Sequence, residues 1–340
     1  MNSYEIALHR VGLSDRSTRG TVAVTGADRT PFLHGLLTND IKALMPGRGC
    51  YAAWLTPQGR MITDMRVLVL DEQILLDVRT ADAMTIATRL EQLVFSEDVQ
   101  ARNITNELSR MRLVGPHAPE TVKAVTAILT PGSSPAPLEG LERWSEHQSA
   151  RVRSDAGDIV VARDDELGVM AYDLLLGGPG HLVAARQLRE SLQQQGIAVL
   201  NDETTETLRI EAGRPLFGVD MDQETIPLEA GIEERAISFS KGCYVGQEVI
   251  VRVTSRGQGR VVRKLVGLTL DGRRVPVHGD TLTAKEREIG RITSATHSPA
   301  LGVPIALGYV HRDFVEPGTS VKVGRDVYAT GVVTSLPFRR

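Results

Sequence analysis

Apolar and polar side chains alternate along many short segments of the chain, and this period of two predicts β-strands. Between these segments, apolar residues recur every three or four positions, which is the spacing of an amphipathic helix. Strands are expected at residues 20–26, 51–55, 61–70, 74–78, 112–114, around 152, 159–162 and 171–176. Helices are expected after Asp28, at 81–94, from 120 onward, at 181–195 and at 204–212. The mixture predicts an α+β protein.

Turn residues join several of these strands into hairpins. The turn Pro57-Gln58-Gly59 separates the strands at 51–55 and 61–70. A second hairpin is predicted from residues 249–254 to 260–270. Further strands near Asp280 and at 289–293, 305–310 and 321–323 are punctuated by Gly and Pro, which is typical of a small antiparallel barrel.

The length of 340 residues is enough for two or three domains, each with its own core. The segment 130–140, TPGSSPAPLEG, is the richest in Pro, Gly and Ser and predicts a surface loop or a lobe boundary. We therefore expect residues 1–260 to form two interleaved lobes that meet near 130–140. Residues 261–340 are expected to form the C-terminal barrel.

Composition excludes several classes of function. A net charge of −3 and an aromatic content of 4% argue against a nucleic-acid partner and against binding to a membrane surface. No stretch approaches the 18 or so apolar residues of a membrane span, and no signal peptide is evident, so we expect a cytoplasmic protein. Cys50 and Cys243 form no CxxC pair and the histidines are scattered, so no metal site is expected.

A glycine-rich turn, residues 177–180, stands between a predicted strand and a predicted helix, a setting that invites a nucleotide-binding interpretation. The pattern Gly178-x-Gly180 continues with Leu182-Val183, so the third glycine of GxGxxG is missing. No GxxxxGK[ST] motif occurs either. A tight turn feeding a helix is the better explanation.

The octapeptide at 241–248, KGCYVGQE, combines the residue types of a reactive site. Gly242 and Gly246 allow positive φ angles or a close approach to a ligand. Lys241 would favour the thiolate of Cys243, which is the reactive form. The alternative is that Cys243 is a small buried hydrophobe, the usual fate of a free cysteine. Cys50, whose charged neighbour is Arg48, is expected to be packed or inert.

KGCYVGQE resembles the signature of the YgfZ family, the folate-binding proteins of iron–sulfur cluster maintenance. That family is similar in fold to the T-protein, the aminomethyltransferase of the glycine cleavage system. Other segments resemble the shared motifs of this superfamily, so the resemblance covers nearly the whole chain. They are residues 26–28 with 32–40, LRIEAG at 208–213, PLEAG at 227–231, GRITS at 290–294 with 298–299, and IALG at 305–308.

The resemblance implies a three-domain cloverleaf: two α/β lobes around a central tetrahydrofolate funnel, plus a C-terminal antiparallel β-barrel. The carboxylate that anchors the pterin would be Glu211, because a carboxylate can accept a pair of pterin N–H groups. Tyr244 and Gln247, in the loop near the funnel, are expected to contact the folate as well.

Asp64 falls where T-proteins carry two adjacent acids, one of them catalytic, but Thr63 replaces the first of them. Val78 stands where T-proteins have an asparagine on the next strand. These departures weaken the case for aminomethyl transfer, and an ordinary edge-strand aspartate is the alternative for Asp64.

Arg252 belongs to a basic stretch that follows the loop, and it is expected to help bind the cofactor. The stretch suggests an anion patch for a folate polyglutamate tail or for an acidic partner, with an ordinary solvated hairpin as the alternative. Its members are Arg252, Arg256, Arg260, Arg263 and Lys264.

Three functional hypotheses follow. In the first, the chain binds tetrahydrofolate and supports assembly or repair of iron–sulfur enzymes through Cys243, with Lys241 activating the thiol. In the second, it is a folate-dependent one-carbon transferase or demethylase with Asp64 as the acid/base group. In the third, it is a scaffold that binds protein partners without folate.

Overall fold

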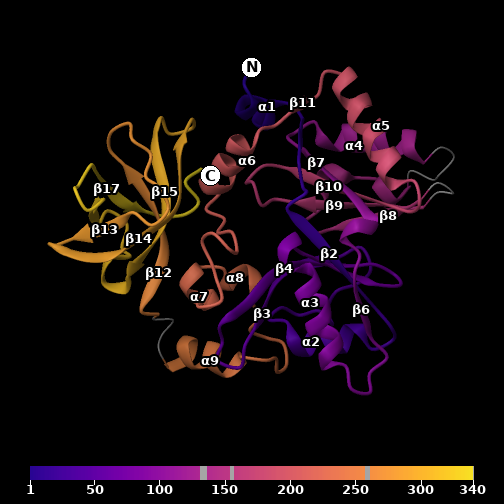
Figure 1. Ribbon diagram of the computed structural model, residues 1–340, viewed down its shortest axis with the longest axis horizontal. Coiled ribbons are helices and arrows are strands. Elements are labelled where there is room, and N and C mark those ends of the chain that lie inside the picture. Colours follow the sequence, from indigo (N-terminus) through magenta and orange to yellow (C-terminus); the bar gives the residue numbers. More distant parts are fainter. Residues whose placement is uncertain (131–135, 154–156, 257–260, 340) are drawn as a thin grey trace.

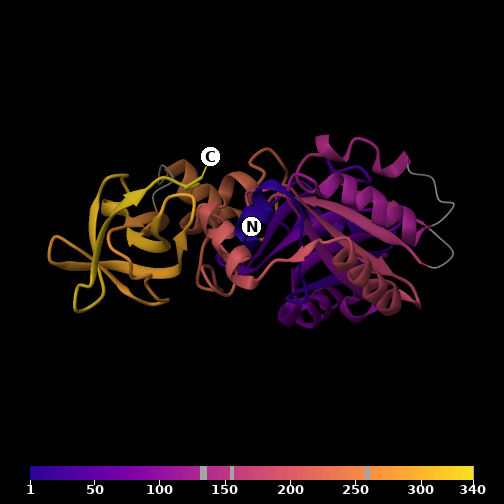
Figure 2. The same cartoon turned by 90° about the horizontal axis from the view of Figure 1, so that it is seen from above.

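Figure 1 presents the computed structural model of the protein, which describes residues 1–130, 136–153, 157–256 and 261–339. Two β-sheets with their helices lie on one side, and a β-barrel lies on the other. Viewed from above, the molecule is elongated, with the barrel at one end and the two sheets at the other (Figure 2). The α+β architecture and the C-terminal barrel predicted from the sequence are confirmed.

The first sheet has the strand order β3-β4-β5-β2-β6 and is covered on one face by two helices. Its alternating residues divide between two cores: Val22 and Val24 pack toward the helices, whereas Ala23 packs toward the second sheet. Its elements are β2 (Arg19–Thr25), α2 (Arg29–Leu36), β3 (Gly49–Leu55), β4 (Met61–Val69), β5 (Ile74–Arg79), α3 (Thr80–Leu93) and β6 (Gln100–Asn103).

The second sheet has the order β11-β1-β7-β10-β9-β8 and carries α4 and α5 on its outer face. The chain crosses between the two sheets, because β1 precedes the whole first sheet in sequence but belongs to the second. Its elements are β1 (Gly12–Ser14), β7 (Leu108–Val114), α4 (Ala118–Leu129), β8 (Ser149–Val152), β9 (Ile159–Asp164), β10 (Ala171–Gly177), α5 (His181–Gln194) and β11 (Ala198–Val199).

The barrel closes in the order β12-β15-β14-β13-β16-β17 around a wholly apolar core. Helices α1 (Ser3–His9) and α6 (Asp202–Glu211) share one apolar cluster, and α6 also contacts β14 and β15, so these helices link the sheets to the barrel. The barrel strands are β12 (Arg263–Leu270), β13 (Thr281–Ala284), β14 (Arg287–Ser298), β15 (Val303–His311), β16 (Ser320–Val323) and β17 (Ala329–Thr334).

Short helices fill the segment between α6 and the barrel: α7 (Pro227–Ala230), α8 (Glu233–Ala236) and α9 (Gln247–Val251). The predicted hairpin arm at 249–254 is wrong, since α9 continues into a π-helical turn, Arg252–Arg256. Burial explains the difference: Ile250 is fully buried beside Tyr244 and Leu55, and this packing outweighs the weak strand preference of β-branched residues.

Two predicted loops fall partly outside the described residues. Residues 131–135 of the predicted 130–140 loop are among them, while Ala136–Leu138 forms a single 3-10 turn. Residues 257–260 of the predicted hairpin, including Arg260, also lie outside.

Candidate functional site

The octapeptide loop at 241–248, hereafter the thiol loop, is fixed to α2 by Lys241. The ammonium group donates to the backbone carbonyls of His34 (2.6 Å), Leu37 (2.6 Å) and Asn39 (3.0 Å). Carbonyls at the end of a helix lack intrahelical partners, and a cation there is favoured by the helix dipole. Lys241 is only 8% exposed and therefore serves as a buried fastening between the loop and α2.

Two further residues hold the thiol loop in place. Tyr244 is buried in the apolar cluster under the loop, and its ring centre lies 5.0 Å from the Lys241 ammonium. Gly246 has a φ of +85°, and a Cβ there would lie 2.5 Å from the Thr56 carbonyl oxygen. Glycine is therefore required where the loop meets the β3–β4 turn.

Cys243 is exposed at the tip of this fixed loop. Gly242 beside it faces open space, and the nearby Phe239 is 60% exposed. The side chains on either side of the thiol thus anchor the loop, while the thiol itself faces solvent. The alternative of a buried structural cysteine does not describe Cys243.

Among the two cysteines, the charge of Lys241 affects the pKa of Cys50. Burial lowers the pKa of Lys241 to about 8 and raises the pKa of Cys50 to about 12, and the nearby ammonium partly offsets the effect on Cys50. The ammonium has three protons, and three carbonyls accept them. Activation of Cys243 by Lys241 remains a prediction from the sequence.

Asp64 lies on β4, facing the space between the two sheets, and is 6% exposed. The Tyr51 hydroxyl donates to its Oδ2 at 2.7 Å, while Oδ1 is buried without a hydrogen-bond partner among the described residues. Burial raises the pKa of Asp64, and the charge of Arg19 partly opposes this rise. Asp64 is therefore an enclosed carboxyl group with one free acceptor, and not an exposed edge-strand residue.

Next to Asp64, a network of buried charges fills the space between the sheets. Strand register creates it, since Arg66 pairs with Asp77 across β4 and β5, and Arg112 pairs with Asp173 across β7 and β10. Arg112 donates to Asp173 at 2.7 Å from Nε, and Arg66 contacts acids on both sheets. The whole set comprises Arg16, Arg19, Arg66, Arg110, Arg112, Asp77, Asp164, Glu166 and Asp173.

The polar region continues from Asp64 toward Arg214. Arg235 stacks over the Tyr51 ring at 5.0 Å and pairs with Glu146 at 2.9 Å. Burial and the charge of Arg235 lower the pKa of Arg214, whose buried Nε has no hydrogen-bond partner in the described part of the chain. One free acceptor and one free donor are thus enclosed in a region of paired charges, and unsatisfied buried groups of this kind call for a ligand or water.

Glu211 has a different environment. Its carboxylate is fully buried and accepts hydrogen bonds from Tyr4 (2.6 Å) and Ser298 (2.5 Å), with Arg339 at 3.7 Å. It therefore joins α1, α6, β14 and the C-terminal segment. The predicted contact between Glu211 and the pterin would have to form beside these partners, at a side chain that is fully buried.

The remaining predicted residues are dispersed. Gln247 is half-buried at the start of α9, and Arg252 is exposed on the π-helical turn. Arg263 and Lys264 lie instead on β12, where they pair with Glu229 (3.2 Å) and Glu233 (3.7 Å). The predicted basic hairpin is therefore not formed, because its first arm is helical.

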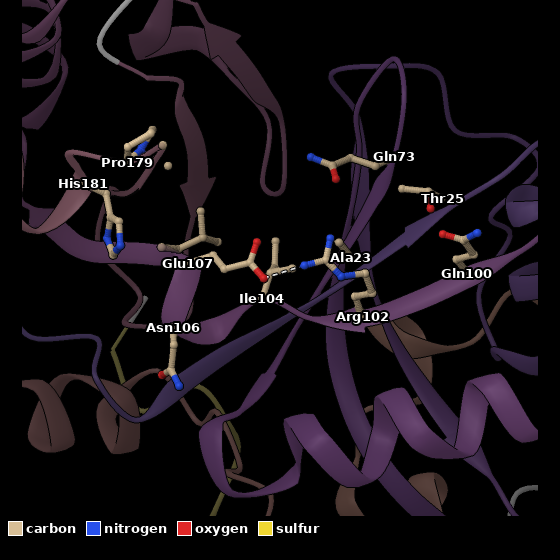
Figure 3. A pocket seen from close by; sticks show the side chains of 13 residues that line it. Ala23, Thr25, Gln73, Gln100, Arg102, Ile104, Asn106, Glu107, Pro179 and His181 are labelled. Atoms are coloured by element: carbon tan, nitrogen blue, oxygen red, sulfur yellow. Dashed lines mark hydrogen bonds and ion pairs between the residues drawn. The ribbon is translucent and has the colours of Figure 1, made fainter.

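The structure also reveals residues that were not predicted. The inter-sheet arginines carried only a weak sequence signal, namely charged residues at alternate positions of apolar strands, and Tyr51 carried none. A separate cavity of about 580 Å³ opens at the outer edge of the inter-sheet space (Figure 3). Arg102 and Glu107 form an ion pair at 2.7 Å there, and the glycine turn and His181 also line the cavity. Neither Cys243 nor Asp64 lines it.

No cluster of side chains suited to a metal ion occurs among the described residues. In the same part of the chain, none of the helices has the length and apolar character that crossing a bilayer requires.

Two family models match the chain: the GCVT N-terminal domain over residues 3–241, and the glycine cleavage T-protein C-terminal barrel domain over residues 263–338. An aminomethyltransferase of Streptomyces coelicolor is 30% identical over 335 residues, which cover 97% of this chain and 86% of that protein. One from Rubrobacter xylanophilus is 31% identical over 337 residues, covering 99% and 85%.

The fold has a close counterpart among solved structures. The glycine cleavage system aminomethyltransferase T of Bartonella henselae superposes with a TM-score of 0.85 at 23% identity, covering 99% of this chain and 88% of that one. Both domains of the family, the two-sheet region and the barrel, are therefore present here in the same order. The chain belongs to the family of the glycine cleavage T-protein.

Proposed function

We propose that this protein binds tetrahydrofolate and uses the Cys243 thiol to support the assembly or repair of iron–sulfur enzymes, as its resemblance to the YgfZ family implies. The observation that carries the proposal is the thiol loop, in which a cysteine is exposed while its neighbours are fastened to the core. A reactive group held in this way is available to a large partner.

The folate part of the proposal rests on family membership and on the polar region around Asp64. A pterin carries both N–H donors and acceptor atoms at its edge. The free Oδ1 of Asp64 and the free Nε of Arg214 are the complementary acceptor and donor. Their burial would strengthen hydrogen bonds to such a ring. Glu211 and Gln247 are less favourably disposed, because one is already paired and the other lies on α9.

The thiol would act with a partner. An iron–sulfur cluster takes about four protein ligands, so a single cysteine cannot hold one. Cys243 would therefore contact a cluster, or a thiol near it, together with residues of the client enzyme or of an assembly protein. The exposed Phe239 next to the loop would add apolar contact area.

A second candidate is folate-dependent aminomethyl transfer or demethylation with Asp64 as the acid/base group. The names of the relatives favour it more directly than they favour the thiol role. Burial also raises the pKa of Asp64, which is the direction that favours an acid/base role for a carboxyl group. Thr63 and Val78, which replace polar residues of T-proteins, count against it.

The first test is a titration of the purified protein with tetrahydrofolate, followed by calorimetry. We expect binding that Asp64→Asn weakens about tenfold and that the exposed control Asp71→Asn leaves unchanged. Absence of binding by the wild type would remove both folate hypotheses and favour a scaffold.

The second test separates the two folate roles in the source organism with the gene deleted. An iron–sulfur dehydratase is assayed in extracts after restoring the wild type, Cys243→Ser or the matched control Cys50→Ser. Rescue by the wild type and by Cys50→Ser, but not by Cys243→Ser, supports the thiol role. If the deletion leaves the dehydratase activity unchanged, folate-dependent one-carbon transfer becomes the favoured function.

A further inference from the structure

A cavity of about 570 Å³ lies between the outer face of the barrel and the segment 218–225. Strand register builds its floor: Tyr309 on β15 stands opposite Arg291 on β14, and His311 on β15 stands opposite Arg263 on β12. Paired residues of antiparallel strands, and residues two apart on one strand, face the same side of a sheet. Three adjacent strands thus direct these four side chains to one surface.

Tyr309 is the unusual member of this set. Its side chain is buried, with 7% of the residue exposed, yet its hydroxyl has no hydrogen-bond partner of acceptable geometry among the described residues. The nearby Thr225 hydroxyl donates elsewhere, to Asp222 at 2.9 Å. Burial raises the pKa of Tyr309, so the phenol keeps its proton and offers a donor to the cavity. A buried donor without an acceptor is costly.

Two arginines and two histidines line the cavity together with this donor. The Arg263 guanidinium lies 4.7 Å from the centre of the Tyr309 ring, and Arg291, His278 and His311 also line the cavity. Each arginine forms one ion pair: Arg263 with Glu229 at 3.2 Å, and Arg291 with Glu288 at 3.2 Å. A guanidinium has five N–H donors, so one such contact leaves others for a ligand.

The acids of the cavity are mostly engaged already. Asp220 accepts hydrogen bonds from Arg209 and Ser294, and Asp222 accepts from Thr225 and from the Glu224 backbone. None of these acids accepts a hydrogen bond from the Tyr309 hydroxyl, and an anionic oxygen of a ligand is an acceptor that the arginines would also attract.

We propose that this cavity binds a carboxylate group of a small molecule, which accepts a hydrogen bond from the Tyr309 hydroxyl and lies beside Arg263 and Arg291. The carboxylate has two sources, a free dicarboxylate or the glutamyl tail of a folate. The second source rests on the proposed function, whereas the first does not.

The test uses the full-length protein and calorimetric titration with glutarate, with monoglutamyl tetrahydrofolate and with triglutamyl tetrahydrofolate. The variants are Tyr309→Phe, which removes only the hydroxyl, and Arg291→Gln. The matched control is Arg287→Gln, a residue of the same strand that does not line the cavity. Melting temperatures check that all variants fold.

We expect Tyr309→Phe and Arg291→Gln to weaken the carboxylate ligand about tenfold and Arg287→Gln to leave it unchanged. If the two variants bind glutarate more weakly than the wild type does, a free dicarboxylate is a sufficient ligand. If only the binding of triglutamyl tetrahydrofolate is weakened, the ligand is the glutamyl tail. If no ligand distinguishes the wild type from Tyr309→Phe, the inference is overturned. Binding of monoglutamyl folate, which depends on Asp64 and not on Tyr309, reports on the proposed function separately.

Discussion

The thiol loop and the region around Asp64 both use buried charged groups, but one exposes its candidate side chain and the other buries it. In the loop, a buried cation holds an exposed functional group, since Lys241 is fixed to α2 and Cys243 faces solvent. Between the sheets, buried ion pairs lie next to a candidate group that is itself buried, the Asp64 carboxyl. The first arrangement makes a side chain available to a macromolecule, and the second shields one from water.

This difference bears on the choice between the two functions. A small ligand can enter an enclosed polar region and satisfy its free donor and acceptor, whereas a protein partner needs a group on the surface. The two regions are therefore compatible within one molecule, and substitutions can alter one region at a time.

The largest effect is expected from Arg112→Met. The Arg112 side chain is 1% exposed and pairs with Asp164, Glu166 and Asp173, so its removal leaves buried carboxylates without compensation. The free energy of unfolding, measured in urea, should fall by about 3–5 kcal/mol. Arg102→Met, which breaks an exposed pair with Glu107, should cost less than about 1 kcal/mol. If the free energy of unfolding fell equally in the two variants, the buried network would stabilise the protein no more than an exposed ion pair does.

The two cysteines should differ in reactivity by more than about a hundredfold. With a pKa of about 12, only about one Cys50 thiol in ten thousand is ionised at pH 8, and the thiolate is the form that alkylates. Iodoacetamide labelling followed by mass spectrometry should therefore modify Cys243 first. Cys243→Ser should abolish the fast phase, and Cys50→Ser should retain it. A fast phase that persists in Cys243→Ser would have to come from Cys50 and would contradict its burial and raised pKa.

Lys241→Met should destabilise the protein by about 2 kcal/mol, because three backbone carbonyls in the last turn of α2 and just after it lose a charged donor. The loop itself should loosen, which limited proteolysis between α8 and α9 would detect as faster cleavage. Lys42→Met, at an exposed position nearby, is the control and should change neither quantity. An unchanged cleavage rate for Lys241→Met would show that Tyr244 and Gly246 suffice to hold the loop.

Elements defined by local pattern could be predicted from the sequence. The β3–β4 hairpin has a Pro-Gln-Gly turn between alternating strands, and α3 has a regular apolar spacing, so both were found close to their observed bounds. The α9 segment was assigned wrongly because its preference depends on burial of Ile250 against residues far away in sequence.

The candidate site shows the same division. Cys243 could be found because the octapeptide is contiguous. The charge network could not, because Arg66 and Arg112 meet Asp164 and Asp173 only once two separate sheets face each other. The fastening of the loop to α2 by Lys241 could not be predicted either, because its partners His34 and Leu37 are 207 and 204 positions away in the sequence.

The smallest effect on the free energy of unfolding is expected for Asp64→Asn, and its size depends on pH. Because the folded state raises the pKa of Asp64, it holds the proton more tightly than the unfolded chain does. The stability that Asp64 contributes is therefore complete below its unfolded pKa, near 4, and is lost as pH rises through the folded value. Asp64→Asn, which stays neutral, should match the wild type at about pH 4.

At about pH 8 the Asn variant should be more stable than the wild type by about 1 kcal/mol, a trade-off common where a functional group is kept in an unfavourable setting. Urea unfolding of both proteins across this range measures the difference, and Asp71→Asn provides the exposed control. A variant that is less stable than the wild type at pH 8 would mean that the ionised carboxylate is favoured there. Asp64 would then be one more member of the charge network, and the proposed function would rest on the thiol loop alone.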